Sequence, residues 1–459
     1  MSGEPAILIP ASFIITDNET FEQRQVKVGD VDDNEIDKPG QSATQGCRTY
    51  SFPIADRTLR IIDTPGVGDT RGLQQDEHNL EQIISHLSRY QHLNEICMLL
   101  KPNASRLSTF FRFCITQLLS YLNVNATDNI IFCFTNARST FYSPGNTAPL
   151  LKQLLRELRE ASKIDIQFSK QNTFCFDNEA FRCLATVKSN LKFDNKQENE
   201  CSRSWDVSVN ESFRFIQYVL SCAPYNLHDT IEFNKIRKII LELARPVLEA
   251  TRTIQMNLKC LNDKKRELNT STSIQKNDNR TPYVELKKIC LQQPRTVCTH
   301  PRCVRVVQSE NIPEIDYITV CHNPCYVPGI EHNTIQNPYI VYCEVFATNN
   351  GRCYHCNCSW EHHMHIYYET KLCMTYLTIP NTSNIYPVQE LDKRIESLNE
   401  EQKIIIEIST RSIQHLKQNS ITAFNDPFAD YINYFVSEER LKCDMGANNQ
   451  FVLNGLEKV

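Results

Sequence analysis

Residues 61–72 read IIDTPGVGDTRG, and this stretch decides the fold of the first half of the chain. An apolar run ends at Asp63, and a loop with glycines at positions 66, 68 and 72 follows it. An aspartate at the tip of a strand can hold Mg²⁺ and its water, and the amide of Gly66 can approach a phosphate because no side chain stands in the way. The alternative interpretation is a strand followed by an ordinary Pro-Gly turn, so the surrounding sequence has to decide.

Length and composition indicate a globular protein of two or more domains. The chain has 459 residues with 41% hydrophobic and 22% charged residues, which is ordinary for such proteins. The net charge of −5 gives no general attraction to nucleic acid. No apolar run reaches the length of a membrane span, and the N-terminus lacks the features of a secretory signal. We therefore expect a cytoplasmic protein without a transmembrane segment, whose 20 cysteines are reduced or bind metal.

Apolar strands alternate with amphipathic helices around the opening stretch. We expect a hairpin over residues 48–52 and 58–63, and then further strands over residues 95–101, 129–135 and 172–176. We expect the helices over residues 76–90, 107–122 and 147–160. This alternation predicts an α/β fold with a mainly parallel sheet and flanking helices.

Polar side chains follow three of these strands, at the edge where parallel sheets bind ligands. They are Asp63, the pair Thr135-Asn136 and the run Asp177-Asn178-Glu179. Three polar clusters at three strand ends are harder to attribute to chance than a single cluster would be. The last run also fits a helix N-cap with an acidic residue in the first turn.

The DTPG sequence with GD two residues later resembles the third motif of the septin-like GTPases, which include septins, immunity-associated GTPases and chloroplast-import receptor GTPases. Residues 40–52, GQSATQGCRTYSF, resemble their first switch, in which Gly40, Ser42 and Thr44 match the pattern GxSxT. The resemblance implies a G domain over residues 1–225 that binds GTP and Mg²⁺. It implies nucleotide or magnesium contacts from Thr44, Asp63, Gly66, Thr135, Asn136, Asn178 and Glu179.

The chain departs from this family in two places. The base-reading pattern Asn-Lys-x-Asp is replaced by Asn136-Ala137-Arg138-Ser139, and Glu179 could supply the missing carboxylate. The phosphate-binding pattern GxxxxGK[ST] does not occur. We expect a G domain that begins inside the fold, as a truncated product or as a protein that has lost nucleotide chemistry. Its missing first strand is central, so two sheet edges should be unpaired or paired anew.

The second half of the chain carries two long helical patterns, over residues 230–270 and 387–420. Their apolar residues recur at roughly heptad spacing, which predicts an antiparallel helical hairpin or coiled coil, within one chain or in a dimer. Two ordinary amphipathic helices packed on the α/β domain are the alternative. We expect a C-terminal helix and a loose tail over residues 421–459.

A cysteine- and histidine-rich segment, residues 285–372, lies between the two helices. Nine of the 20 cysteines fall between Cys290 and Cys358, closely paired along the chain in the manner of tetrahedral zinc sites. The predicted ligands are Cys298, Cys303, Cys353, Cys356, Cys358 and either His362 or His365, followed by Cys321, Cys325 and His322. The many thiols favour closed, structural Zn²⁺ sites. Buried free thiols and a metal-free histidine cluster are the alternative.

Two functions fit these features. The first is a GTP-binding switch or assembly protein of the septin-like group, a GTPase by resemblance whose nucleotide binding is weakened or lost without the phosphate loop. It would bind protein partners through its nucleotide face or coiled coil and form a homodimer. The alternative is a non-catalytic interaction scaffold with a coiled-coil arm and structural zinc. A nucleic-acid partner is not expected, because no dense basic patch accompanies the cysteines.

Overall fold

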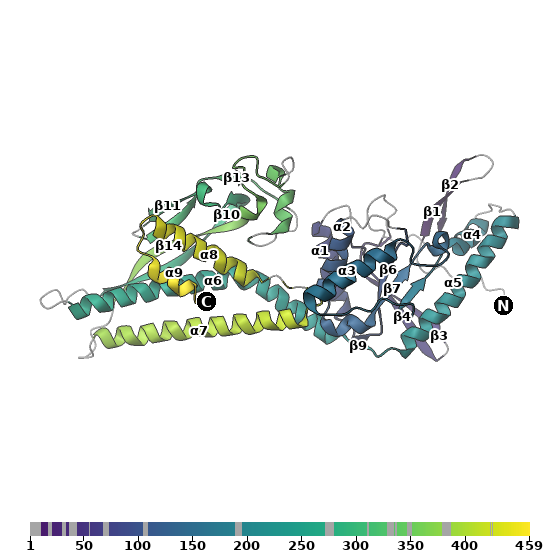
Figure 1. Ribbon diagram of the computed structural model, residues 1–459, viewed down its shortest axis with the longest axis horizontal. Helices are drawn as coiled ribbons and strands as arrows, with labels where there is room; N and C mark the ends of the chain where they lie inside the picture. Colours follow the sequence, from purple (N-terminus) through teal and green to yellow (C-terminus); the bar gives the residue numbers. More distant parts are fainter. Residues whose placement is uncertain are drawn as a thin grey trace. The chain divides into compact units, whose positions relative to one another are not determined.

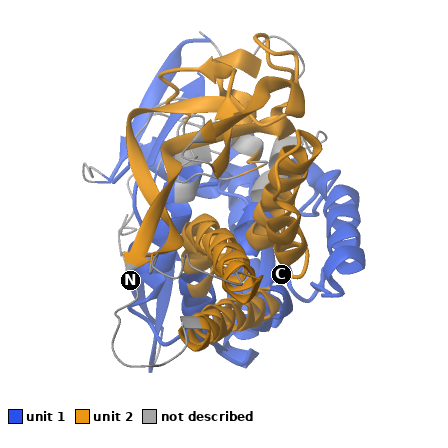
Figure 2. Ribbon diagram, turned by 90° about the vertical axis from the view of Figure 1, so that its left-hand side faces the viewer, with its two compact units in different colours: residues 1–235, 417–424 blue, residues 236–416, 425–459 orange. Residues whose placement is uncertain are grey.

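The computed structural model forms two compact units, which Figure 2 colours separately. Unit 1 contains residues 1–235 and 417–424, and unit 2 contains residues 236–416 and 425–459. The structure describes residues 11–16, 21–29, 34–35, 44–54, 56–67, 73–103, 109–188, 195–270, 280–309, 312–327, 335, 337–346, 351–378, 387–422, 424 and 426–459.

Unit 1 is built on a parallel three-stranded sheet in the order β6-β7-β8. Its strands are β6 Ile96–Leu100, β7 Ile130–Phe134 and β8 Thr173–Cys175 (Figure 1). Strand β7 is buried on both faces, which explains its continuous apolar sequence IIFCF. The alternation of strands and helices therefore gives the mixed α/β architecture that the sequence predicts.

Helices cover both faces of this sheet. Phe132 and Phe134 share a core with Leu119 of α2 (Thr109–Ser120) and Leu151 of α3 (Thr147–Ser162). Ile131 and Phe174 face the other way and pack against Phe215 of α5 (Asn195–Ser221). Within the described residues, unit 1 also contains the helices α1 Leu73–Leu87 and α4 Glu179–Lys188.

An antiparallel hairpin of β3 Arg48–Ile54 and β4 Arg57–Asp63 forms a separate sheet. Among the described residues, β4 pairs only with β3, and β6 pairs only with β7. Leu99 of β6 is 69% exposed, although a strand of a helix-covered parallel sheet normally buries such a side chain.

Two further strand pairs complete unit 1. They are β1 Ala11–Thr16 with β2 Gln23–Val28, and β5 His92–Leu93 with β9 Tyr225–Asn226.

Unit 2 contains a pair of long antiparallel helices, α6 Leu227–Thr270, whose first turns belong to unit 1, and α7 Pro387–Asn419. Leu258 and Leu261 of α6 share a core with Leu391 and Leu398 of α7. Lys265 pairs with Asp392, and Gln255 pairs with Gln402. Both pairs have the same sum of residue numbers, so the two helices run in opposite directions.

None of the helices in the described part of the chain has an apolar stretch that could span a membrane.

A long antiparallel ladder joins β10 Arg280–Cys298 to β14 His363–Thr378. Strand β13, Val320–His322, pairs with the other edge of β10 near its end. Strands β11 Val304–Ser309 and β12 Ile312–Tyr317 form a second hairpin. The sequence predicted a cysteine- and histidine-rich module here but not this ladder.

The C-terminal segment is more ordered than expected. Helix α8 spans Pro427–Asp444. Its N-cap is Asp426, whose carboxylate accepts hydrogen bonds from the amides of Phe428 and Ala429. Helix α9 Gln450–Leu456 follows where the sequence predicted a loose tail, so that part of the prediction is wrong. Its buried face comprises Val452, Leu453 and Leu456. Seven residues are too few for a helical period to be recognised in the sequence.

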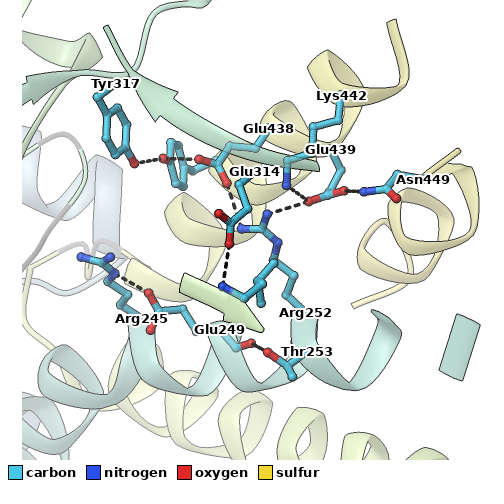
Figure 3. A network of polar contacts seen from close by, with 12 residues as sticks. Arg245, Glu249, Arg252, Thr253, Glu314, Tyr317, Glu438, Glu439, Lys442 and Asn449 are labelled. Atoms are coloured by element: carbon cyan, nitrogen blue, oxygen red, sulfur yellow. Dashed lines mark hydrogen bonds and ion pairs between the residues drawn. The ribbon is translucent and has the colours of Figure 1, made fainter. Parts of the chain in front are cut away.

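A buried polar network ties α6, β12, β14 and α8 together inside unit 2 (Figure 3). The guanidinium of Arg252 contacts the carboxylates of Glu438 and Glu439 at 3.0 and 2.9 Å. Glu439 also accepts hydrogen bonds from Lys442 and Asn449, each at 2.7 Å. Further contacts join Tyr317 to Tyr434, Tyr368 to Glu249 and the amide of Leu372 to Glu314. The buried charges are therefore paired, as burial requires.

Candidate metal centre

Among the described residues, three groups of cysteine and histidine side chains that could hold metal ions lie where β10 ends and β14 begins. Group A is Cys298, Cys303, Cys356 and Cys358. Group B is Cys321, Cys353, Cys356 and His363. Group C is His322, Cys325 and Cys343. Within each group, the candidate donor atoms lie within 4.8 Å of one another.

The β-sheet distributes the donors among the groups. Cys298, the last residue of β10, pairs directly with His363, the first residue of β14. Cys321 and His322 are neighbours in β13, and successive side chains of a strand point to opposite faces. Cys321 therefore joins group B while His322 joins group C.

The distances in groups A and B suit tetrahedral coordination. A zinc ion with Zn–S bonds of about 2.3 Å and Zn–N bonds of about 2.0 Å spaces its donors about 3.8 Å (S to S) and about 3.5 Å (S to N) apart. The Sγ atoms of Cys321 and Cys356 are 3.8 Å apart, and those of Cys303 and Cys358 are 3.9 Å apart. The Nε2 atom of His363 lies 3.5 Å from Cys321 Sγ and 3.3 Å from Cys356 Sγ.

A hydrogen bond fixes the orientation of the His363 ring. Its Nδ1 atom lies 2.9 Å from the carbonyl oxygen of Ser359, so Nδ1–H donates and Nε2 keeps its lone pair for the thiols. Burial lowers the pKa of His363 to about 4. The ring is therefore neutral at pH 7, the form that ligates metals.

Group C contains a thiol, Cys343, whose pKa its surroundings lower. A hydrogen bond from Cys325, 3.5 Å away, lowers the pKa of Cys343 to about 6, with help from the Val345 amide and His322. His322 Nδ1 lies 3.2 Å from Cys343 Sγ, and its Nε2 faces the carboxylate of Glu344 at 3.5 Å. A carboxylate behind a ligating imidazole is a common outer-shell arrangement in metal sites.

His365 lies beside group C without being a member of it. Its Nδ1 is 3.4 Å from Thr296 Oγ1, and the same hydroxyl donates to Cys325 Sγ at 3.1 Å. Burial lowers the pKa of His365 to about 4. Its Nε2 is buried and has no hydrogen-bond partner within the described part of the chain.

Backbone amides support at least one thiol in every group. Burial raises the pKa of Cys356 to about 12, and a hydrogen bond from the amide of Cys358 opposes that shift. The amide of His300 does the same for Cys298, and that of Val345 for Cys343. In each case the amide lies two residues after the cysteine and favours the thiolate, which is the form that binds metal.

The structure brings most of the predicted ligands together. Cys298, Cys303, Cys353, Cys356 and Cys358 fall in groups A and B, while Cys321 and Cys325 fall in groups B and C. His362 is exposed, packs its ring on that of His300 and belongs to none of the groups among the described residues.

The predicted ligand set omitted His363 and Cys343. Predicting His363 requires knowing that β14 begins there, since the strand turns His363 and His365 to the same face and leaves His362 in the preceding turn. Cys343 has no partner close to it in the sequence and meets Cys325 only through the fold.

Unit 1 places Thr44 beside Asp63. The Thr44 hydroxyl donates to the Asp63 carboxylate at 3.2 Å, and the carboxylate of Glu35 lies 3.4 Å from the same hydroxyl. Burial and the charge of Asp63 raise the pKa of Glu35. The carbonyl of Gly66 accepts a hydrogen bond from Asn79. Gly40 and Ser42 lie outside the described residues.

Two further predicted clusters meet at the ends of β7 and β8. Asp177 accepts hydrogen bonds from the amides of Arg138 and Glu179 at 3.2 and 2.8 Å, so it joins the loops after the two strands. Glu179 forms an ion pair with Arg182, Asn178 is exposed, and Asn136 has a left-handed backbone. Asp177 therefore acts as the cap that the alternative interpretation expected, while Thr135 and Asn136 lie at the end of β7.

A family model described as a domain of unknown function (DUF8206) matches residues 290–369. This segment contains every member of groups A, B and C, together with His365. No curated protein matches the chain.

Proposed function

We propose that residues 280–378 form a zinc-stabilised module that binds other proteins, and that its zinc is structural. The observation that carries this proposal is the closed donor set of groups A and B, each of which has four donors. Catalytic zinc usually keeps one coordination position for water or substrate, whereas structural zinc does not. In this proposal a modest rotation lets His365 supply the fourth donor to group C.

Three exposed tyrosines make the module suitable for protein recognition. Tyr326, Tyr342 and Tyr354 are 69%, 64% and 60% exposed, and each is next in sequence to a donor cysteine. Tyrosine is enriched in protein interfaces. Because metal binding would fix the neighbouring backbone, these side chains would be held in place before a partner arrives.

Site-specific photo-cross-linking tests this role. A photoreactive amino acid replaces Tyr326, Tyr342 or Tyr354 in the zinc-loaded chain, and Tyr376 of β14, which is 59% exposed, serves as the control position. We expect cross-linked protein species from the first three positions and few from the control. A Cys325→Ser background should abolish those from positions 326 and 342, which neighbour donors of group C, and should spare those from position 354, which neighbours a donor of group B. The proposal would be contradicted if position 376 gave as much cross-linked protein as the other positions. It would also be contradicted if Cys325→Ser did not reduce the yield of cross-linked protein from positions 326 and 342.

A second candidate is the GTP-binding switch or assembly protein. It is favoured by the contact between Thr44 and Asp63 and by the three-stranded parallel sheet. Thr44 and Asp63 would hold Mg²⁺, and Thr135, Asn136, Asn178 and Glu179 would border the base. Affinity would be weak because no GxxxxGK[ST] sequence is present.

Titration with fluorescent GTP and Mg²⁺ tests this candidate. Asp63→Ala should abolish binding, whereas Asp56→Ala, in the exposed turn of the same hairpin, should not. A chimaera carrying an upstream strand and phosphate loop should bind more tightly. Absence of binding by both the chain and the chimaera would leave only the scaffold role. Sedimentation with and without GTP would show whether nucleotide drives dimerisation.

A further inference from the structure

We infer that groups A and B form one binuclear centre in which the Cys356 thiolate bridges two metal ions. This inference rests on the proposed zinc module and specifies how its metal is held. Two separate four-coordinate ions need eight donors, but the two groups together offer seven because Cys356 belongs to both. A bridging thiolate gives each ion four donors and leaves none unused.

The position of Cys356 fits this role. Its Sγ lies 3.8 Å from Cys321 Sγ and 3.3 Å from His363 Nε2 on the side of group B. It also lies within 4.8 Å of the three other sulfurs of group A, those of Cys298, Cys303 and Cys358. Two ions that share one sulfur can be no more than about 4.6 Å apart, twice the usual Zn–S bond.

The loop over residues 353–358 is built to supply both ions. The Cys353 amide donates to the Cys358 carbonyl at 2.9 Å, and the Asn357 amide donates to the Cys353 carbonyl at 2.8 Å, so the loop closes on itself. Asn357 adopts a left-handed backbone with φ of 58°, which asparagine tolerates well. This turn directs Cys353 to group B, Cys358 to group A and Cys356 to both.

A single ion in this region would leave some of the buried donors without metal. Cys298, Cys321 and Cys353 are fully buried, and Cys303 and Cys358 are almost so. One ion can take only four of the seven donors, so three would remain unligated. With a bridged pair, all seven donors bind metal, and the Cys356 sulfur also keeps its hydrogen bond from the Cys358 amide.

Group C is a separate site that shares no donor with the other two groups. The complete chain should therefore bind three zinc ions, two in the bridged pair and one in group C. The loss of a donor to group C should leave the pair intact.

Native mass spectrometry and zinc X-ray absorption spectroscopy of the full chain test the inference. We expect three zinc ions per chain and a Zn–Zn scattering shell below 4.6 Å, twice the bond length cited above. Cys325→Ser should remove one ion and keep the Zn–Zn shell. Cys356→Ser should remove the shell and at least one ion, whereas Cys290→Ser, an exposed cysteine of β10 outside the groups, should change neither.

Two outcomes would overturn the bridge while leaving the zinc module standing. One is a zinc-loaded wild-type protein whose spectrum has no Zn–Zn shell. The other is a wild-type protein that binds only one ion in groups A and B together. Because the wild-type spectrum decides the matter, misfolding of Cys356→Ser would not remove the test. A chain that contains no zinc would refute the proposed module as well.

Discussion

Replacement of Glu439 by glutamine should destabilise unit 2 strongly. Glu439 is completely buried and accepts hydrogen bonds from Arg252 at 2.9 Å and from Lys442 at 2.7 Å. The two cations are balanced by the two anions Glu438 and Glu439. Glutamine has a similar shape but no charge, so two buried cations would share one carboxylate. Breaking a buried ion pair from one side costs about 3–5 kcal/mol, roughly a hundred- to several-thousand-fold in the folding equilibrium.

Urea unfolding followed by Trp360 fluorescence measures this cost. The chain has two tryptophans, and Trp205 lies in unit 1, so a Trp205→Phe background makes Trp360 the reporter of unit 2. Glu457→Gln, which removes the exposed partner of Arg440, is the matched control and should cost less than about 1 kcal/mol.

A double-mutant cycle separates charge imbalance from simple loss of contacts. Lys442→Met alone should also destabilise, because it leaves two carboxylates with Arg252. The double variant restores the balance of one cation and one anion, so its cost should fall short of the sum of the single costs by about 1–3 kcal/mol. Additive costs, or a cost below about 1 kcal/mol for Glu439→Gln, would refute the reasoning.

The free energy of unfolding of unit 2 should also depend on pH through the ionisation of Glu439. Burial alone raises the pKa of Glu439, but the charges of Arg252 and Lys442 outweigh it and hold the pKa below the usual 4.5. The unfolded chain therefore binds this proton more readily, and the stabilisation is present above pH 4.5 and is lost as the pH falls through the folded-state pKa. The Glu439→Gln variant should lack this component of acid sensitivity.

Three further predictions concern single features of the two units. Burial raises the pKa of Glu95 from 4.5 to about 7, so its contribution to stability is lost as the pH rises through this range. Glu95→Gln should therefore stabilise unit 1 by about 1–2 kcal/mol at pH 8, after discounting for partial exposure, and not at pH 4, as measured by Trp205 fluorescence. Asn257 bonds both the amide and the carbonyl of Val284 at 2.7 and 3.1 Å, so Asn257→Ala should cost about 2–4 kcal/mol in urea unfolding, and an unchanged midpoint would contradict this. A zinc chelator should lower the melting temperature reported by Trp360 more than that reported by Trp205, because all the candidate donors lie in unit 2; an unchanged melt together with an absence of zinc in elemental analysis would contradict the metal assignment.

The elements that sequence predicts well are those whose burial imposes a clear pattern. Strand β7 was expected over residues 129–135 and spans Ile130–Phe134, because both of its faces are buried and its sequence is continuously apolar. Helix α6 was expected over residues 230–270 and spans Leu227–Thr270, because buried apolar residues recur along it, among them Phe233, Ile240, Leu248 and Leu261.

The long ladder escaped prediction because its burial follows no simple period. Strand β10 is exposed over much of its middle and fully buried only near its ends. Its sequence RTPYVELKKICLQQPRTVC accordingly mixes lysine and glutamine with apolar residues and does not alternate. The choice of His363 over His362 depends on where β14 begins. Because the sequence does not reveal that boundary, it could not identify the ligating histidine.

The composition of the module's core explains why metal would be needed to fold it. In the described part of the chain, eleven buried side chains form this core, and seven of them are cysteines of the three metal groups. Among the described residues, its other buried members are Val327, Ile340, Val345 and Phe346, and the partly buried Trp360 packs against them. Thiols contribute less to a hydrophobic core than larger apolar groups do. In the proposed zinc module, metal–thiolate bonds would supply much of the energy that orders these loops, so metal binding and folding of the module should be a single transition.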